Sequence, residues 1–273
     1  MMDQRPIGVF DSGLGGLTTV KKLTEYLPSE KIVYLGDTGR VPYGSRSRET
    51  IIKYAGQDAA FLAEFDIKAM VIACNTVCSV AYEILAMEYA MPVYEVVNAP
   101  TKAAASLTKN GKIGVIGTAA TIRSGAYEAS LKGISPDLQV FSVACPLFVP
   151  LAENGRTDTQ DIATLTIASD YLKELCDAEV DTLILGCTHY PLLREVIANV
   201  MGSHVSLVDS GAETAKMVAE DLRKRRLLNL KTQDGQNGSV KYFVTDSIEG
   251  FSTLASKYLE AEVNGMVEQV TLE

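Results

Sequence analysis

The sequence lacks an excess of positive charge, a membrane-length apolar run and a segment typical of a signal peptide. Its 273 residues carry a formal net charge of −9, whereas a protein that binds nucleic acid without sequence preference needs a basic surface. The longest apolar runs are strand-sized, well below the roughly 20 residues of a membrane-spanning helix. The first ten residues, MMDQRPIGVF, lack the basic region and apolar core of a secretory leader. We therefore expect a cytoplasmic protein that binds neither nucleic acid nor membranes.

Cysteine and histidine are too few and too scattered to indicate a disulfide framework or a zinc site. The five cysteines are an odd number, which does not suggest a set of disulfides. Together with the two histidines they match no zinc-ligand spacing, and we expect no metal. Cys78, Cys145 and Cys176 stand in patterns typical of packing residues. Cys74 and Cys187 differ from these three, because each follows an apolar run and precedes polar residues.

The order of apolar and amphipathic segments predicts an α/β fold with parallel sheets. Two series of four strand-like runs occur, at 7–10, 31–36, 69–73 and 93–97, and again at 112–117, 138–143, 182–186 and 205–209. Helix-length segments separate the runs. Short apolar strands that alternate with helices are typical of parallel sheets covered on both faces.

The two series carry similar residues directly after their equivalent strands, which indicates the duplication of a whole domain. The first strands lead into Asp11-Ser12-Gly13 and into Gly117-Thr118, and the third strands lead into Cys74-Asn75-Thr76 and into Cys187-Thr188-His189. We expect two pseudo-symmetric, open parallel-sheet lobes. Residues 1–97 and 209–273 form the first lobe, because the extra strand at 241–246 returns to it, and residues 98–208 form the second.

The duplicated cysteines predict a reaction centre in the cleft between the lobes. Ligands of open parallel sheets bind beyond the carboxyl ends of the strands, where Cys74 and Cys187 both stand. Each cysteine precedes a predicted helix, and free N–H groups at a helix start favour an anionic ligand and a thiolate. Two thiols on opposite sides of a small molecule suit a proton that leaves one face of a carbon and returns on the other.

Other polar residues near these strand ends have alternative interpretations. Asp11 could orient or deprotonate a thiol, or it could cap the following helix. His189 could assist Cys187, or it could be a hydrogen-bonded histidine at the head of a helix. Tyr43 and Gly44 lie in a Pro-containing turn after the second strand. They could close over a ligand or form an ordinary loop.

Three motifs, DSGLGG at 11–16, ACNTV at 73–77 and GCTHYP at 186–191, resemble the aspartate/glutamate racemase family, and within it the members that act on glutamate. The resemblance extends over nearly the whole chain, including GDTGRVPYG at 36–44 and CPLFVPLAENG at 145–155. It implies cofactor-independent interconversion of L- and D-glutamate, which supplies D-glutamate for peptidoglycan. Relatives that act on aspartate tend to carry an acidic residue where His189 stands, which favours glutamate as the substrate.

The resemblance also implies roles for individual residues. It makes Cys74 and Cys187 the acid/base thiols, with Asp11, His189 and Glu153 as their helpers. The positions that would hold the substrate are Asp11, Ser12, Tyr43, Gly44, Asn75, Thr76, Thr118, Thr121, Thr188 and His189.

Three other functions remain open at the level of the sequence. The same chemistry could act on aspartate or on another amino acid. A hydrolase or transferase could use one of the cysteines as a nucleophile. A two-lobed binding protein could hold an amino acid unchanged, although the duplicated cysteine would then have no explanation. No pattern determines the oligomeric state, and a homodimer is our working expectation.

Overall fold

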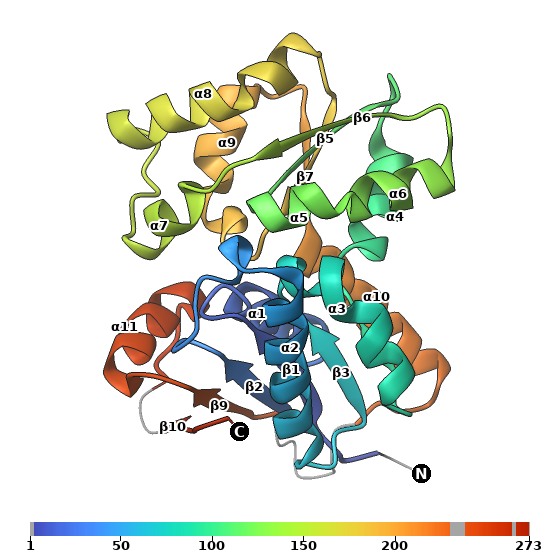
Figure 1. Cartoon of the computed structure of the whole chain (residues 1–273), viewed down its shortest axis with the longest axis vertical. Helices are drawn as coiled ribbons and strands as arrows, with labels where there is room; N and C mark the ends of the chain where they lie inside the picture. The colour runs from blue at the N-terminus through green and yellow to red at the C-terminus, as the bar shows by residue number, and fades with distance from the viewer. Residues whose placement is uncertain (1–2, 230–237, 264–265, 273) are drawn as a thin grey trace.

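Two parallel β-sheets, each with helices on both faces, lie one above the other in Figure 1. The computed structural model describes residues 3–229, 238–263 and 266–272. The α/β class and the two parallel sheets predicted from the sequence are confirmed. In the parts of the chain that the structure describes, no helix has both the length and the apolarity needed to cross a bilayer.

The first sheet has six strands in the order β10-β9-β2-β1-β3-β4. Their bounds are β1 Ile7–Asp11, β2 Ile32–Gly36, β3 Ala69–Ile72, β4 Val93–Tyr94, β9 Val240–Val244 and β10 Val267–Gln269. The second sheet has the order β6-β5-β7-β8, with β5 Lys112–Gly117, β6 Gln139–Ala144, β7 Thr182–Gly186 and β8 Ser206–Asp209. The order β2-β1-β3-β4 repeats position by position as β6-β5-β7-β8, as a duplicated domain requires.

The helices that cover the first sheet are α1 (Leu17–Tyr26), α2 (Arg48–Ala63), α3 (Asn75–Glu88) and α11 (Ile248–Leu259). The second sheet carries α5 (Ala119–Ser124), α6 (Ala126–Ile134), α7 (Phe148–Glu153), α8 (Ile162–Asp177) and α9 (Arg194–Met201). Two further helices, α4 (Asn98–Leu107) and α10 (Ser210–Lys224), follow the points where the chain passes between the sheets, and they pack on each other. The short 3-10 helices are η1 (Tyr43–Ser45) and η2 (Tyr190–Leu193).

We call the first sheet with its covering helices the first lobe, and the second sheet with its helices the second lobe. The strand at 240–244 joins the first sheet beside β2, in parallel. This pairing supports a discontinuous first lobe. The boundaries expected from the sequence, 1–97 plus 209–273 and 98–208, stay a prediction.

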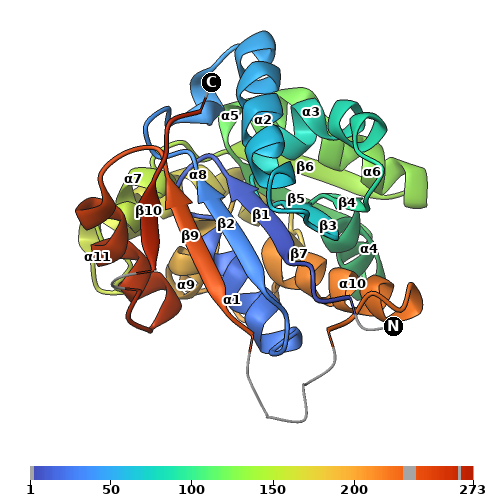
Figure 2. The ribbon, with the colours of Figure 1, turned by 90° about the horizontal axis from the view of Figure 1, so that it is seen from below.

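Strands β1 to β3 are buried along their whole length because both of their faces are covered. In β2, Ile32 and Tyr34 belong to a core that includes residues of α1, α10 and α11, whereas Val33 and Leu35 face the core formed with α2 and α3. Successive strand residues point to opposite faces, so each strand supplies both cores. Figure 2 shows the first sheet from below, with α2 and α3 on one side and α1 on the other.

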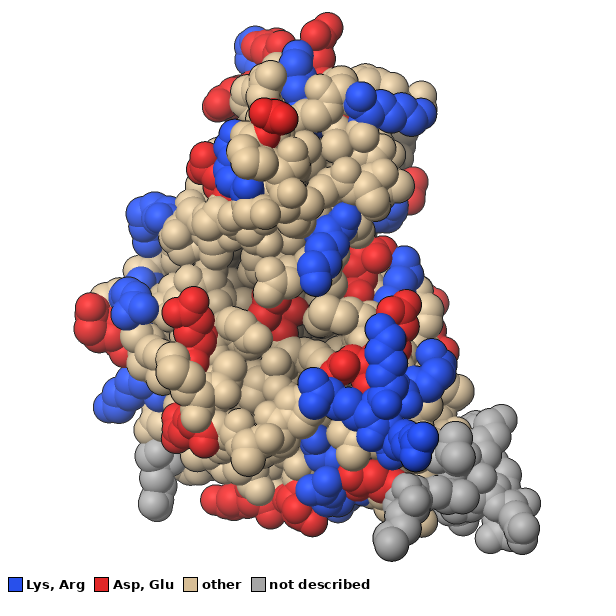
Figure 3. Space-filling view, turned by 90° about the vertical axis from the view of Figure 1, so that its right-hand side faces the viewer, with Lys and Arg blue, Asp and Glu red and all other residues tan. Residues whose placement is uncertain are grey.

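The surface carries charges of both signs. Figure 3 shows acidic and basic side chains interspersed over one face of the molecule. The basic run at residues 223–226 covers the last turn of α10 and the residues just after it, where cations complement the helix dipole. Arg225 forms an ion pair with Asp221 of the same helix at 2.6 Å. The position of this basic run is therefore explained by the end of α10, with no need for a bound partner.

Candidate active site

A cavity of about 580 Å³ lies between the lobes, at the carboxyl ends of the strands. From the first lobe it is lined by Ser12, Gly13, residues 41–45 and residues 74–76. From the second lobe it is lined by Thr118, Ala119, Arg123, Pro146, Val149, Pro150, Glu153, Cys187, Thr188 and His189. The structure thus brings both cysteines of the duplicated motif to one cavity, from matching strands β3 and β7.

Cys74 lies two residues beyond β3, at the N-cap position of α3. Its side chain is buried, and Sγ donates a hydrogen bond to Ser12 Oγ at 3.4 Å. Burial, together with the nearby negative charge of Asp11, raises the pKa of the Cys74 thiol to about 12. Near neutral pH the group is therefore a thiol that can donate a proton.

Cys187 has a different setting from Cys74, although the predicted helical segment does follow it, from Tyr190 to Met201. Cys187 and Thr188 form a turn after β7. The 3-10 helix η2 begins at Tyr190, and α9 begins at Arg194. Pro191 stands in the first turn of η2, where its missing N–H would have had no partner within the helix. Cys187 therefore stands three residues ahead of η2, whereas Cys74 is itself the N-cap residue of α3, and Cys187 has a histidine partner.

His189 bridges Cys187 and Glu153. Its Nδ1 lies 3.9 Å from Cys187 Sγ, and its Nε2 lies 3.0 Å from Glu153 Oε1. Burial opposes a charge on the imidazole, but the contacts with Cys187 and Glu153 outweigh it and raise the pKa of His189 to about 10. The ring is therefore protonated near neutral pH, which places a positive charge beside the second sulfur.

Asp11 ends β1 and is fully buried, one layer behind the residues that line the cavity. Its carboxylate accepts hydrogen bonds from the Gly13 N–H at 3.0 Å and from Thr188 Oγ1 at 3.5 Å. Gly16 and not Asp11 is the N-cap residue of α1, although the Gly16 backbone N–H also bonds the Asp11 carboxylate. Burial raises the pKa of Asp11. The acidic residue of the first lobe therefore contacts the second cysteine's turn.

Three threonine hydroxyls meet where the lobes face each other. Thr76 Oγ1 lies 2.9 Å from Thr118 Oγ1 and 3.4 Å from Thr121 Oγ1. Thr118 caps α5 by accepting the Thr121 N–H at 3.2 Å. Thr76 and Thr118 line the cavity, and Thr121 lies behind them. The cluster places hydroxyl groups from both lobes beside the cysteines, where they can bond a carboxylate.

Tyr43 and Gly44 contribute differently from each other. The Tyr43 hydroxyl bonds Asp58 Oδ2 at 3.1 Å and also contacts Asp37, so it is directed into the interior of the first lobe. Gly44 faces the second lobe, and a Cβ built on it would lie 2.9 Å from Thr118 Cβ. A ligand would therefore meet Tyr43 and Gly44 mainly through their backbone.

Sequence reasoning missed Arg123 and the apolar residues of the cavity wall. Of the described residues that line the cavity, Arg123 is the one lysine or arginine. It lies on α5, the helix that Thr118 caps and Thr121 belongs to. That shared helix is the signal that could have found it. The apolar residues Val41, Pro146, Val149 and Pro150 stand in loops and in a short helix, where the sequence pattern gives no indication of a cavity.

The other cysteines lie outside this cavity. Cys78 Sγ donates to the Ile72 carbonyl at 3.1 Å, Cys145 packs in the second lobe's core, and Cys176 is exposed on α8. Within the described ranges, no three His, Cys, Asp or Glu side chains come together as a metal ion would require.

The sequence profile described as Asp/Glu/Hydantoin racemase matches residues 7–218. The chain belongs to this racemase family. Glutamate racemase from Geobacter metallireducens is 48% identical over 272 residues, covering all of this chain and 98% of the relative.

Solved structures of the racemase family share the fold over the full length. Glutamate racemase isoform RacE1 from Bacillus anthracis superimposes with a TM-score of 0.93 at 37% identity, covering 99% of this chain and 98% of that one. Glutamate racemase from Francisella tularensis, in a complex with D-glutamate, gives 0.91 at 40% identity and covers 100% of this chain and 99% of its own. Family membership and the two-sheet architecture predicted from the sequence are thus confirmed.

Proposed function

We propose that this chain interconverts L- and D-glutamate without a cofactor, by acid/base chemistry of two cysteines, and thereby supplies D-glutamate for peptidoglycan. One observation carries the proposal: Cys74 and Cys187 reach a single cavity from equivalent strands of the two lobes. The similar proteins named glutamate racemase, one of them in a complex with D-glutamate, support glutamate over aspartate or another amino acid as the substrate.

In this mechanism one sulfur, as a thiolate, takes the α-proton of the substrate, and the other, as a thiol, delivers a proton to the opposite face. The raised pKa of Cys74 makes it the proton donor of the resting enzyme. Protonated His189, at 3.9 Å, would stabilise negative charge on the Cys187 sulfur in the direction that uses this residue as the base. After one turnover the two sulfurs have exchanged protonation states, and the enzyme is ready for the reverse reaction.

The proposed binding residues would stabilise the carbanion that forms between the two proton transfers. Hydrogen bonds to the substrate carboxylate withdraw charge from the α-carbon, and they are strongest where water is excluded. Asn75, Thr76, Thr118 and Ser12 line the cavity and can donate such bonds. Asp11 and Thr121 would act from behind this layer, Glu153 through His189, and Tyr43 and Gly44 through their backbone.

The same proposal covers location and partners. A glutamate racemase that serves peptidoglycan synthesis works in the cytoplasm, with a small amino acid as its ligand. The homodimer expected from the sequence stays a prediction.

The test is an assay of purified protein with L-glutamate, D-glutamate and L-aspartate and no added cofactor, followed by circular dichroism. We expect glutamate to be racemised, and Cys74→Ala and Cys187→Ala to lose racemisation while remaining folded. Cys176→Ala, which removes an exposed thiol outside the cavity, should keep the wild-type rate. If aspartate alone is racemised, the assignment of glutamate as the substrate is wrong. A covalent adduct seen by mass spectrometry would indicate that one thiol acts as a nucleophile instead.

A further inference from the structure

Tyr127 of the second lobe is bonded to a cavity residue of the first lobe. The tyrosine lies on α6 and is only 2% exposed. Its hydroxyl lies against Asn75 Oδ1 and 2.9 Å from the Val96 carbonyl oxygen, and it shares its one proton between these two acceptors. A phenol at this depth is costly to bury unless it is hydrogen-bonded, and Asn75 satisfies it across the lobe boundary.

Asn75 is held from its other end by Ser210. Its Nδ2 donates to Ser210 Oγ at 3.4 Å. A carboxamide has two N–H donors and one oxygen. With the oxygen turned to Tyr127 and one N–H turned to Ser210, the second N–H of Asn75 is left to bond a ligand. Asn75 lines the cavity, so a carboxylate in it can meet a donor.

The same contacts lie at both places where the chain passes between the lobes. Val96 belongs to the segment that leaves β4 for α4, and Ser210 is the first residue of α10, directly after β8. Tyr127 therefore links Asn75 to the outgoing passage, and Asn75 itself contacts the returning one. The orientation of Asn75 is set by groups from both lobes.

We propose that Tyr127 is a positioning residue, whose hydroxyl fixes the Asn75 carboxamide so that the amide donor faces the substrate carboxylate. The inference rests on the proposed function of the cavity. A carboxamide turned by half a rotation would present its oxygen to the carboxylate, and the two groups would repel each other. In the observed arrangement the Tyr127 hydroxyl donates to Oδ1, which turns the amide N–H groups toward Ser210 and the cavity.

The first test is Tyr127→Phe, which keeps the ring and removes the hydroxyl. We expect Kd for D-glutamate, measured by calorimetry, and KM to rise roughly threefold to tenfold, as loss of one hydrogen bond predicts, with a smaller change in kcat. Tyr94→Phe is the matched control. Its buried hydroxyl bonds Asp221 at 2.7 Å outside the cavity, so this variant should keep the wild-type Kd.

The second test is a double-mutant cycle with Asn75→Ala. If Tyr127 acts through Asn75, Tyr127→Phe should change Kd little once Asn75 is truncated. Equal effects in both backgrounds, or an unchanged Kd in Tyr127→Phe, would overturn the inference. If Tyr127→Phe does not fold, Ser210→Ala takes its place with a smaller expected rise, and an unchanged Kd there overturns it equally. Wild-type protein that binds D-glutamate without racemising it would overturn the proposed function instead.

Discussion

Gly15 of the first lobe approaches Thr188 of the second so closely that a Cβ built on the glycine would lie 2.1 Å from Thr188 Oγ1. The same added carbon would lie 2.5 Å from His189 Nδ1. Thr18, one turn further on, donates from Oγ1 to the Thr188 carbonyl at 3.0 Å. The glycine-rich loop after β1 therefore packs directly against the turn that carries Cys187. Only a residue without a side chain fits at position 15.

Gly15→Ala should displace Thr188 and His189 and lower kcat by roughly two orders of magnitude, the scale lost when an acid/base group is misplaced. The fold should survive, because the clash lies at the lobe boundary. Gly56→Ala on α2 is the control, since an added Cβ meets nothing within 4 Å there. It should retain activity and gain about 0.5–1 kcal/mol of stability. Wild-type kcat in Gly15→Ala would contradict this role of the loop.

The His189 pKa predicts an alkaline limit on activity. The pKa of about 10 in the folded protein lies above the ordinary 6.5, so the folded state favours the imidazolium. The stability from its contacts is fully present below about pH 6.5 and is lost as the pH rises through about 10. In the direction that uses Cys187 as the base, we expect kcat/KM to fall over the same upper range.

His189→Asn removes the titrating group and keeps a polar side chain of similar reach. The variant should lower kcat/KM. It should also remove the alkaline limb of the pH profile in the direction that uses Cys187 as the base. Full pH profiles measured from both enantiomers would show this. If the alkaline limb of the kcat/KM profile is unchanged in His189→Asn, the group that titrates there is another residue.

Arg123 should attract the second carboxylate of the substrate. Glutamate is an anion, the chain carries a net charge of −9, and Arg123 is the one lysine or arginine on the described cavity wall. We expect Arg123→Gln to raise KM roughly threefold to tenfold, as for one exposed charge contact. Arg123→Lys should restore most of the loss, and added salt should narrow the difference between wild type and Arg123→Gln.

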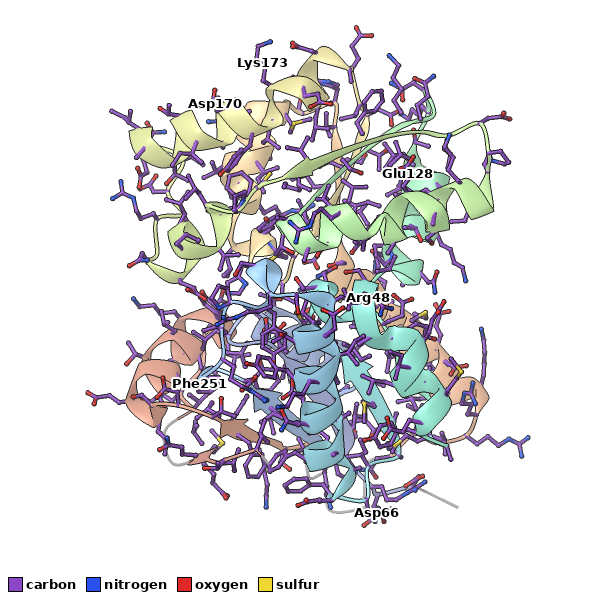
Figure 4. All side chains as sticks on the ribbon, in the orientation of Figure 1. Arg48, Asp66, Glu128, Asp170, Lys173 and Phe251 are labelled. Carbon is purple, nitrogen blue, oxygen red and sulfur yellow. The ribbon has the colours of Figure 1, made fainter. Side chains whose placement is uncertain are left out.

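Lys173→Gln provides the control for net charge. Figure 4 shows Lys173 on α8, far from the lobe boundary, and the change removes the same unit of charge. Its KM should match that of wild type. An equal rise in KM for both variants would make the effect one of overall charge and not of the cavity wall.

Much of the fold and the two central residues could be predicted because they depend on local patterns. Continuous apolar runs such as IVYLG and TLILG indicate strands that are buried on both faces. The repeat of ACNT as GCTH marks the ends of equivalent strands. Parallel strands place their carboxyl ends on one edge, so Cys74 and Cys187 could be expected at a shared cleft.

The features that could not be predicted depend on contacts between residues distant in the chain. The Asp11 carboxylate bonds Thr188, 177 positions away, and no pattern indicates that it would reach the opposite lobe. Tyr43 stands in a turn typical of binding loops, yet buried Asp37 and Asp58 hold its hydroxyl inside. The close packing of Gly15 against Thr188 and His189 likewise appears only once the two lobes are assembled.

Proton exchange in deuterated water tests the two-sulfur account most directly. L-glutamate should be incubated with the protein in D2O, and the Cα deuterium content of both enantiomers measured by NMR and mass spectrometry during the first few percent of conversion. We predict that D-glutamate forms with deuterium at Cα, while the remaining L-glutamate keeps its hydrogen. D-glutamate that retains the original hydrogen, or L-glutamate that exchanges as fast as product forms, would contradict proton transfer between two opposed thiols.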